Sequence, residues 1–438
     1  MYRSLEKELI KWKKRESRYP LLLRGARQVG KTYLVEKFGK TEFSSYVSVN
    51  FEAQPEAIAC FENLNPDEIL LRLQVILKKP IYPGKTLLFL DEIQVCPKAI
   101  MALRYFKEKM PKLHVIGAGS LLEFALVQGK FSFPVGRVQF LYLKPLSFEE
   151  YLLARGKKAI SEEILESENA KIHEEMMYLV KEYFLIGGMP ATVSSFCEHQ
   201  NLEESSRIHE VLLSTYQADF SKYATSAEQK YLKILFNGIF QMIAQHFKYS
   251  KIDAHIRSRE LKIALDHLQW AGLVHPIYVS SAAGIPLSAQ LKRTRFKILF
   301  LDIGLVQHFL QIDPKVVLEN HLIQINRGAL AEQFVGQELL AYHSPYQEGQ
   351  LFYWEKEKKG TDAEVDFLYV FEQQIIPIEV KAGSSGKLKS LCTFMKKKKS
   401  TIGIHISQNP LSFEDRILSV PFYLIGKIPE LLRKYSTS

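Results

Sequence analysis

The sequence predicts an α/β protein with a parallel sheet in its N-terminal domain, a mainly helical middle and a mixed α/β domain at its C-terminal end. Two observations lead to this fold class. Short apolar runs alternate with helical patterns over roughly the first third of the chain, and a second set of apolar runs follows a helical pattern after about residue 325. Alternating strands and helices are typical of a parallel sheet covered on both faces. A chain of 438 residues is also too long for one core, so several domains are expected.

Residues 1–155 form the first predicted domain. Strands are expected at "PLLLRG", "SYVSVNF", "TLLFLDE", "LHVIGAGS" and "VQFLYL", because these are short apolar runs. Helices are expected between them at "KTYLVEKFGK", "EILLRLQVILKK" and "PKAIMALRYFKEKM". Ligands of open parallel sheets bind beyond the carboxyl ends of the strands, so the residues that follow these runs are the candidates for a site.

A phosphate-binding loop follows the first predicted strand and opens a predicted helix. "GARQVGKT" matches the pattern G-x-x-x-x-G-K-[ST] of a P-loop. Its backbone N–H groups would surround phosphates, its lysine would reach the β- and γ-phosphates, and its threonine would bind Mg²⁺. The pattern therefore predicts ATP and Mg²⁺ as cofactors. The residues expected to contact the nucleotide are Gly25, Ala26, Arg27, Gln28, Val29, Gly30, Lys31 and Thr32.

Polar residues after the later strands complete the predicted nucleotide site. Asp91 ends the apolar run of "LLFLDE" and is expected to hold Mg²⁺, while Glu92 would polarise the attacking water. Ser120, in "VIGAGS", would contact the γ-phosphate or the water; a loop-capping serine is the alternative. Arg137, in "FPVGRVQF", would stabilise the transition state in the site of a neighbouring subunit, and a surface arginine is the alternative.

The middle of the chain is predicted to have two parts. Residues 156–225 would form a helical lid or connector, with one helix at "EEMMYLVKEYFLIGGMP" that ends at its glycines. Residues 226–310 resemble a winged helix, because the helical patterns "AEQKYLKILFNGIFQMIAQHF" and "SRELKIALDHLQW" precede two strand patterns with "AAGIPLSAQLKRT" as the wing tip. Basic residues that could contact phosphates in this part are Lys248, Lys251, Arg257, Arg259, Lys262, Lys292, Arg293, Arg295 and Lys297. The alternative is a packing module between the two ends of the chain.

Residues 325–438 form the last predicted domain, and they carry a second candidate site. The helix "GALAEQFVGQELLAYH" precedes strand patterns at "LFYWEK", "AEVDFLYVF", "QIIPIEVK", "TIGIHIS" and "VPFYLIG". Asp366, Glu379 and Lys381 resemble the D…[DE]-x-K core of the restriction-endonuclease-like fold, and Glu379 and Lys381 share one face of a strand. This resemblance implies a Mg²⁺ site at Asp366, Glu379 and Glu332, with Glu338 as the second choice for the helical acid, and with Lys381 steering a water. A solvated salt-bridge cluster, or nucleic-acid binding without cleavage, is the alternative.

Several landmarks together resemble one large prokaryotic family. They are "LLLRGARQVGKTYL", "LFLDEIQ", "GAGSLLEF", "VGRVQFLYLKPLSFEEYL", "YFLIGGMP" and "FKILFLDIGL". The family consists of AAA-type P-loop ATPases with a C-terminal domain of unknown function. The match keeps the order of the landmarks over nearly the whole chain, and it implies the fold and the ATPase class more directly than it implies a task.

Composition and charge add expectations about partners. The formal net charge is +10, which suits a polyanionic partner, either nucleic acid or an anionic membrane surface; an ordinary basic surface is the alternative. Among nucleic acids, DNA is the expected partner. The four cysteines are scattered, and no apolar run is long enough to span a membrane, so a soluble cytoplasmic protein without membrane contact is expected. The position of Arg137 predicts a homo-oligomer, with a hexamer as one form. The leading hypothesis is an ATPase coupled to nucleic-acid binding or processing; a nucleotide-dependent signalling switch and a protein remodeller are the alternatives.

Overall fold

The structure, a computed structural model, describes residues 1–128, 132–157, 170–319, 328–356, 363–383 and 388–436. The chain forms two compact units. Unit 1 contains residues 1–144, 270–272 and 344–348, and unit 2 contains residues 145–269, 273–343 and 349–438. The predicted α/β fold class is confirmed in both. The predicted domain start at 325 and residues 158–169 of the predicted connector lie outside the described residues.

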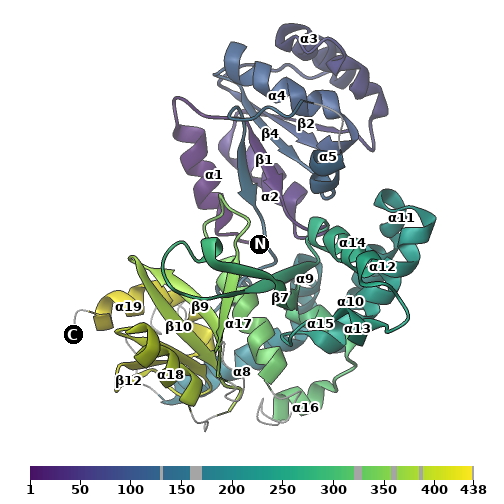
Figure 1. Cartoon of the computed structure of the whole chain (residues 1–438). Coiled ribbons are helices and arrows are strands. Elements are labelled where there is room, and N and C mark those ends of the chain that lie inside the picture. Colours follow the sequence, from purple (N-terminus) through teal and green to yellow (C-terminus); the bar gives the residue numbers. More distant parts are fainter. Residues whose placement is uncertain (129–131, 158–169, 320–327, 357–362, 384–387, 437–438) are drawn as a thin grey trace. The chain divides into compact units, whose positions relative to one another are not determined.

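Unit 1 is built on a parallel sheet with the strand order β2-β3-β4-β1-β5 (Figure 1). The strands are β1 Leu21–Arg24, β2 Ser45–Asn50, β3 Thr86–Asp91, β4 His114–Ala118 and β5 Gln139–Tyr142. The helices are α1 Leu5–Lys14, α2 Lys31–Glu42, α3 Pro66–Leu77, α4 Pro97–Lys109 and α5 Leu122–Gln128, with short 3₁₀ helices at Pro55–Phe61 and Ile93–Val95. All five predicted strands and all three predicted helices of this part are confirmed.

The register of the sheet brings the candidate residues of unit 1 to one edge. Ala118 at the end of β4 pairs with Asp91 of β3 and with Leu23 of β1. The strands stay in place because β3 is buried along its whole length and packs with α3 and α4 into one apolar core. The P-loop, Asp91 and the segment after β4 therefore lie at the same end of the sheet.

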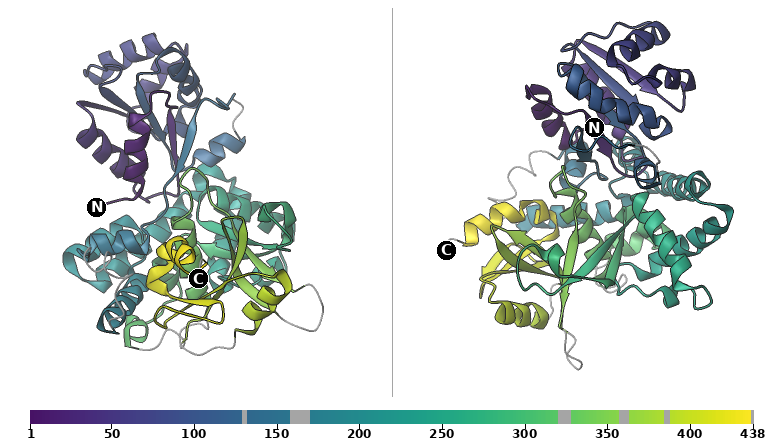
Figure 2. Two further views of the ribbon diagram at one scale, coloured as in Figure 1. Left: turned by 90° about the vertical axis from the view of Figure 1, so that its left-hand side faces the viewer. Right: turned by 45° about the horizontal axis from the view of Figure 1, so that its top comes forward.

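Unit 2 contains an eight-stranded mixed sheet with the order β12-β13-β11-β10-β9-β8-β6-β7. Its strands are β6 Val274–Ser280, β7 Leu291–Phe300, β8 Leu351–Glu355, β9 Glu364–Phe371, β10 Gln374–Val380, β11 Gly403–Ser407, β12 Ser412–Glu414 and β13 Ile417–Pro421. Two further views show each sheet with its own covering helices (Figure 2).

The helices of unit 2 fall into a middle group and a C-terminal group. The middle group is α6 Phe148–Ala154, α8 Ala170–Ile186, α9 Pro190–His199, α10 Leu202–Ala218, α11 Phe220–Tyr223, α12 Ser226–Ile239, α13 Tyr249–Ile252, α14 Ser258–Trp270, α15 Ile303–Phe309 and α16 Pro314–Glu319. The C-terminal group is α17 Ala329–Ala341, α18 Lys389–Lys398 and α19 Ile428–Ser436. Short 3₁₀ helices lie at Phe240–Met242, Leu287–Gln290 and Phe422–Lys427. None of the described helices is both long enough and apolar enough to cross a bilayer.

The ribbon predicted as a wing belongs to the large sheet of unit 2. β6 pairs with β7 as predicted, and its other edge pairs in parallel with β8. Ala282 and Leu287, from the predicted wing tip, are buried against Phe352 and Trp354 of β8. A wing tip of that kind would be exposed, so this segment instead completes a core. A separate winged helix at residues 226–310 is not confirmed.

Two element predictions in unit 2 are corrected. The long helix expected to reach Phe247 ends at Ile239, because the segment after it runs beside β7 and donates backbone hydrogen bonds from Ala244 and Phe247 to that strand. The last predicted strand, "VPFYLIG", ends at Pro421 and continues as a 3₁₀ helix. In both cases tertiary packing overrides the local apolar pattern.

Candidate functional site

The P-loop has the backbone conformation that its glycines allow. Gly25 and Gly30 have φ values of 142° and 93°, and Gln28 lies in the left-handed region with a φ of 65°. A Cβ on Gly25 would lie 2.2 Å from the carbonyl oxygen of Leu143, so only glycine fits there. The loop then enters α2 at Lys31 with Gly30 as its N-cap residue. The N–H groups of the first turn are thus available to an anion.

Lys31, Thr32 and Asp91 come together as the sequence predicts. The buried ammonium of Lys31 donates to the carbonyl oxygens of Gly25 and Ala26 at 2.9 and 2.8 Å. Burial lowers the pKa of Lys31 to about 8, although the nearby charges of Glu92 and Asp91 oppose this effect. The hydroxyl of Thr32 donates to Oδ2 of Asp91 at 3.1 Å. Hydroxyl and carboxylate oxygens are the ligands that Mg²⁺ prefers, so this pair fits the predicted metal position.

Asp91 and Glu92 differ in their surroundings. Asp91 accepts from the side chains of Thr32 and Asn50 and from the N–H of Glu92, while burial and the charge of Glu92 raise its pKa. Glu92 has a φ of 49°, and its carboxylate accepts a hydrogen bond of 2.7 Å from Nε2 of Gln94. Gln94, which the sequence analysis did not single out, therefore orients the carboxylate proposed to act on water.

Ser120 and Arg137 are the other two residues of unit 1 that were predicted to act on the nucleotide. Ser120 is buried and follows β4 by two residues, which places it at the edge that also carries Asp91. Arg137 precedes β5 and forms an ion pair with Glu108 at the end of α4, with Nε and Oε1 3.0 Å apart. Its side chain is about half exposed at 47%. Neither role is tested by this geometry.

Two further arginines border the P-loop, since Arg3 contacts it and Arg24 directly precedes it, and the sequence analysis did not identify them. Arg3 is buried and donates to the carbonyl oxygens of Val29 at 2.9 Å and of Lys144 at 2.5 Å. Arg24, the last residue of β1, pairs with Glu123 of α5 and lies over the ring of Tyr142. No local pattern marks these arginines, because their partners are far away in the sequence.

The four predicted residues of the C-terminal site also meet. Glu332 comes from the first turn of α17, Asp366 from β9 and Glu379 from the end of β10, and Lys381 directly follows that strand. Asp366 accepts a hydrogen bond of 2.8 Å from the N–H of Val380, which ties β9 to β10, and Lys381 pairs with Glu379 at 2.6 Å. The second carboxylate oxygen of Glu379 is buried and has no hydrogen-bond partner among the described residues. We call Glu332, Glu364, Asp366 and Glu379 the acidic cluster.

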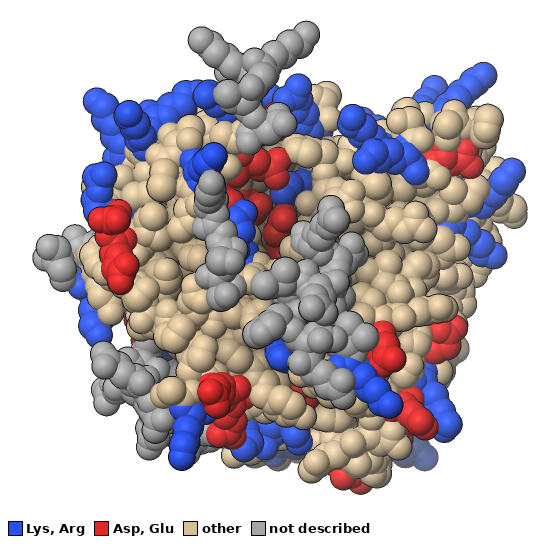
Figure 3. Space-filling model, turned by 90° about the horizontal axis from the view of Figure 1, so that it is seen from below, with Lys and Arg blue, Asp and Glu red and all other residues tan. Residues whose placement is uncertain are grey.

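Lys297 lies inside the acidic cluster rather than on a basic surface. Its side chain is only 3% exposed, and its Nζ lies 2.9 Å from Oε2 of Glu332, 2.5 Å from Oε1 of Glu364 and 3.7 Å from Oδ1 of Asp366. The prediction that Lys297 could contact phosphates from the ribbon is therefore wrong, because its ammonium is enclosed by carboxylates. On the face of the molecule seen in Figure 3, acidic and basic side chains likewise lie together in a hollow.

The cluster shifts the pKa values of its members in different directions. Burial, and then the charge of Asp366, raise the pKa of Glu332 to about 8 and that of Glu379 to about 7. Burial would also raise the pKa of Glu364, but the hydrogen bond from His246 and the charge of Lys297 lower it to about 2. His246 lies 2.7 Å from Glu364, and with Glu355 these residues form a group whose ligand atoms lie within 4.8 Å of one another.

Glu338, the second choice for the helical acid, has another role. Both of its carboxylate oxygens lie 3.1 Å from the N–H of Phe148, the first residue of α6. Burial raises its pKa to about 8. Glu338 thus faces α6, while Glu332, nearly two helical turns earlier, faces the acidic cluster.

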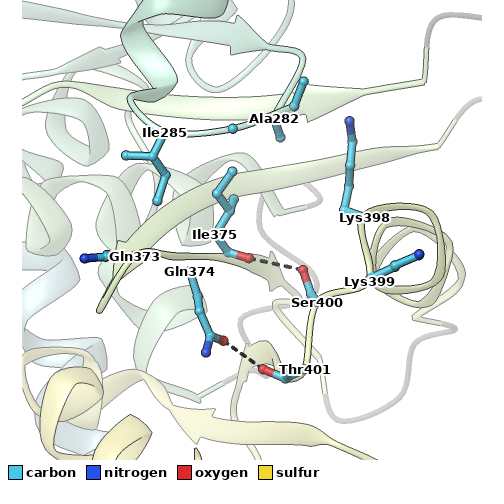
Figure 4. Close-up of a pocket in the computed structure, with 11 residues that line it drawn as sticks. Ala282, Ile285, Gln373, Gln374, Ile375, Lys398, Lys399, Ser400 and Thr401 are labelled. Atoms are coloured by element: carbon cyan, nitrogen blue, oxygen red, sulfur yellow. Dashed lines mark hydrogen bonds between the residues drawn. The ribbon is translucent and has the colours of Figure 1, made fainter.

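A separate cavity of about 560 Å³ lies between the β6–β7 connection, the β9–β10 hairpin and the end of α18 (Figure 4). Ser400 donates to the carbonyl oxygen of Ile375, and Thr401 donates to the side chain of Gln374. Lys398 and Lys399 are the titratable residues that line it. Because the hydroxyl groups of Ser400 and Thr401 are already hydrogen-bonded, this cavity has fewer groups available to a ligand than the P-loop site or the acidic cluster.

Comparison with protein families divides the chain into three matched segments. Residues 17–152 match an AAA domain family, residues 177–316 match a domain of unknown function (DUF8612), and residues 327–425 match a second domain of unknown function (DUF4143). A search of curated proteins gave no match. The chain thus carries an AAA-type P-loop ATPase domain and a C-terminal domain of unknown function, as the resemblance implied.

Solved structures with similar folds include several P-loop proteins. The Walker-type ATPase of Pyrococcus abyssi is 15% identical, with a TM-score of 0.44 over 70% of this chain and 94% of its own. The ORC2 protein of Aeropyrum pernix is 13% identical, with a TM-score of 0.34 over 76% and 91%. The RuvB Holliday junction branch migration motor of Thermotoga maritima is 15% identical, with a TM-score of 0.31 over 68% and 92%. At these values the likenesses carry no inference about function.

Proposed function

We propose that this chain hydrolyses ATP at the P-loop of unit 1, with Mg²⁺ held by Thr32 and Asp91. The observation that carries the proposal is the hydrogen bond between these two side chains, beside the buried ammonium of Lys31. Lys31 would exchange its two carbonyl partners for phosphate oxygens, and the N–H groups of the loop would hold the remaining phosphate charge. When bound, Mg²⁺ would offset negative charge on the phosphates.

Glu92 is the residue proposed to orient and deprotonate the attacking water, with Gln94 fixing its carboxylate. Ser120 would supply a hydroxyl to the γ-phosphate or to that water. Both roles are supported by the common sheet edge at which β3 and β4 end. The chain's own contribution is therefore to place a base and a hydrogen-bond donor around a phosphate that the loop already holds.

The test of this site uses two substitutions with matched controls. Lys31→Ala should abolish ATP binding, whereas Glu92→Gln should bind ATP and lower turnover by about 10²-fold or more, the typical contribution of a general base. Lys85→Ala and Glu62→Gln remove the same groups from exposed positions and should leave both properties unchanged. Binding is measured by calorimetry and turnover by phosphate release. Wild-type turnover in the Glu92→Gln variant would assign the base to another residue.

We further propose that unit 2 binds nucleic acid, with DNA as the first candidate, and that this binding is coupled to ATP turnover. Eight of the nine predicted basic residues are exposed, namely Lys248, Lys251, Arg257, Arg259, Lys262, Lys292, Arg293 and Arg295. One contact connects two of the segments that carry them. Phe247, just before α13, stacks on Phe296 of β7. Grouped positive charge of this kind favours a phosphate backbone.

ATP turnover with and without DNA separates this proposal from its alternatives. A nucleic-acid-coupled ATPase should turn over faster when single- or double-stranded DNA is added. A nucleotide-dependent switch should turn over slowly in both conditions and change its oligomeric state with the nucleotide. DNA that neither binds nor alters turnover would favour the switch or a protein remodeller.

A second candidate activity is Mg²⁺-dependent phosphodiester cleavage at Asp366, Glu379 and Lys381, with Glu332 as a further ligand. The meeting of all four residues, and the buried oxygen of Glu379 without a described partner, favour it. Asp366→Ala and Lys381→Ala should each abolish cleavage while ATP turnover continues. If the wild type with Mg²⁺ or Mn²⁺ and ATP leaves linear, circular, single-stranded and branched DNA and RNA intact, this activity is excluded and recognition remains the proposed role of unit 2.

A further inference from the structure

Lys297 occupies the place in the acidic cluster where a cation is needed. Its Nζ lies within 4 Å of carboxylate oxygens from Glu332, Glu364 and Asp366, which come from a helix and from the strand β9. Carboxylates crowded in this way repel one another unless a positive charge sits among them. An ammonium group meets that need with hydrogen bonds, and a divalent ion would meet it with coordination bonds.

The surroundings of Lys297 fix its ammonium in this position. The residue lies on β7 between Phe296 and Ile298, both of which are buried, and His246 forms a bridge with its backbone. The ring of Tyr353 lies beneath the ammonium, with Nζ 5.5 Å from its centre. Removing a buried partner of this kind leaves uncompensated charge, which is strongly destabilising.

One part of the cluster is nevertheless left unsatisfied. The ammonium of Lys297 pairs with Glu332, Glu364 and Asp366. Lys381 pairs with one carboxylate oxygen of Glu379. The other oxygen of Glu379 is buried without a partner in the described chain. A buried carboxylate oxygen normally has a partner. The acidic cluster therefore contains carboxylate ligands for a divalent ion, but the ammonium of Lys297 occupies the position that the ion would take.

We propose that Lys297 is a built-in cation that closes the acidic cluster to divalent metal, so that metal binds only where the ammonium is removed or displaced. The metal would be Mg²⁺ or Mn²⁺, since the ligands are carboxylate oxygens. This inference takes its ligands from the second candidate activity and competes with it, because the cluster cannot hold the Mg²⁺ needed for cleavage while the ammonium of Lys297 stays in place.

The test measures Mn²⁺ binding without nucleotide in the Asp91→Asn background, which removes the carboxylate proposed to hold metal at the P-loop. Lys297→Met keeps most of the length of the side chain and removes its charge. It should bind Mn²⁺ about tenfold or more tightly than the parent, because a unit charge that repels the metal at short range is gone. Calorimetry gives the affinity. Without metal the variant should melt below the parent, and Mn²⁺ should restore its melting temperature while changing that of the parent little.

Two controls distinguish this effect from a general loss of positive charge. Lys381→Met removes the other lysine beside the cluster, and it should not reproduce the metal-dependent recovery of stability. Adding Asp366→Asn to Lys297→Met should remove the gained Mn²⁺ affinity, because Asp366 is one of the ligands.

Three results would overturn the inference. The parent could bind Mn²⁺ as tightly as Lys297→Met, or the variant could bind it no better. The third such result is failure of Lys297→Met to fold even when it is produced and purified with Mn²⁺. That failure would mean that the metal cannot replace the ammonium. A Lys297→Met protein that gains Mn²⁺ affinity but leaves DNA and RNA intact would uphold the inference and exclude cleavage, so the two failures are separable.

Discussion

Glu338 is a buried carboxylate that the sequence suggests as a metal ligand, but in the structure it joins two helices. The residue lies six positions after Glu332 on α17, and its oxygens accept from the N–H of Phe148 at the start of α6. An acid at the N-terminal end of a helix satisfies N–H groups that have no partner inside that helix. Glu338 therefore joins α17 to α6, and its charge state matters for stability rather than for chemistry.

The raised pKa of Glu338 predicts a pH-dependent effect of Glu338→Gln. The pKa rises from its usual value of 4.5 to about 8 on folding, because burial disfavours the ionised form. Proton binding thus stabilises the folded state below pH 4.5, and this contribution is lost as the pH rises toward 8. Glutamine resembles the protonated acid and can still accept from Phe148. The melting temperature of the variant, relative to wild type, should increase by a few degrees between pH 5 and pH 8.5.

Measurement of both melting curves at several pH values checks this prediction. Glu203→Gln, at an exposed position in the first turn of α10, is the control and should show no such trend. A constant difference between Glu338→Gln and wild type over the whole range would mean that Glu338 titrates in the folded state near its usual pKa.

Single residues also show what sequence patterns can and cannot reveal. Glu364 lies two positions before Asp366, so strand periodicity already places both on one face of β9. Lys297 carried a weaker signal, a lysine inside the apolar run "RFKILFLD". Such a lysine requires a buried partner, but the pattern does not say which one. Its three carboxylate partners lie 35, 67 and 69 positions away, and only the folded chain brings them together.

At the scale of elements, α1 is connected to the P-loop through Arg3. This arginine precedes α1 and bridges the carbonyl oxygens of Val29 in the loop and Lys144 after β5. Leu5, Leu9 and Trp12 bury one face of the helix and so hold the arginine in place. The N-terminal helix therefore helps to set the position of the loop through the arginine that precedes it.

Arg3→Met should weaken ATP binding by about tenfold or more, because it removes two hydrogen bonds from a charged donor and leaves a loop carbonyl unpaired. Calorimetric titration with ATP analogues measures the affinity. Arg72→Met is the matched control, since exposed Arg72 contacts Glu68 at 3.7 Å and donates to the carbonyl oxygen of Ala59 at 3.4 Å, neither of which belongs to the P-loop. This variant should bind ATP as wild type does. If Arg3→Met keeps the wild-type affinity while the protein stays folded, the loop holds its shape by itself.

The β6–β7 ribbon marks the limit of element prediction from sequence. Each strand was predicted from its own apolar run, as were the five strands of unit 1, because local periodicity determines them. The pairing of β6 with β8 depends on residues about 75 positions apart, and no local signal specifies it. For the same reason Ala282 and Leu287, from the predicted wing tip, proved to be part of the core around Trp354.

The surroundings of the basic residues on β7 determine which of them we expect to contact nucleic acid. Lys292 and Arg293 are exposed on β7, whereas Arg295 pairs with Glu355 and Lys297 is enclosed by the acidic cluster. Replacing Lys292 and Arg293 by alanine should reduce the slope of log affinity for DNA against log salt by about one unit per lost phosphate contact, up to about two. Adding Arg295→Ala should change the slope less, because Glu355 offsets its charge.

Fluorescence anisotropy of labelled DNA across a salt series measures these slopes. The control removes two exposed charges at the C-terminal end of α18, with Lys396→Ala in the helix and Lys399→Ala just after it, and should leave the slope unchanged if these side chains face only solvent. An unaltered slope after removal of Lys292 and Arg293 would assign DNA binding to a different surface of unit 2.

At the scale of the whole molecule, two units with separate candidate chemistry share one chain. Unit 1 contains the P-loop, and unit 2 contains the exposed basic residues and the acidic cluster. The family matches end one segment at residue 316 and begin the next at 327, yet strands from both segments form the sheet of unit 2. The matched segments are therefore not independent folding units, and truncation between them would expose the edge of β6 or β8.

Oligomer formation is the remaining prediction at this scale, and Arg137 tests it. If the arginine acts in the site of a neighbouring subunit, Arg137→Ala should lower ATP turnover by roughly 10³-fold. If it serves only its surface ion pair with Glu108, stability should change little and turnover should stay intact, because exposed ion pairs are screened by water. Glu108→Ala is the control, because it breaks the same ion pair and keeps the arginine.

Mixed oligomers give the decisive measurement. Arg137→Ala and Glu92→Gln subunits are each inactive under this hypothesis, but an interface with Glu92 from the first and Arg137 from the second contains both groups. Mixing the two proteins should therefore restore part of the turnover, in proportion to the number of such interfaces. Glu108→Ala should stay active alone, since its arginine is free to reach a neighbour. Full turnover by a protein that stays monomeric in analytical ultracentrifugation would contradict the shared site and leave Arg137 as a surface residue.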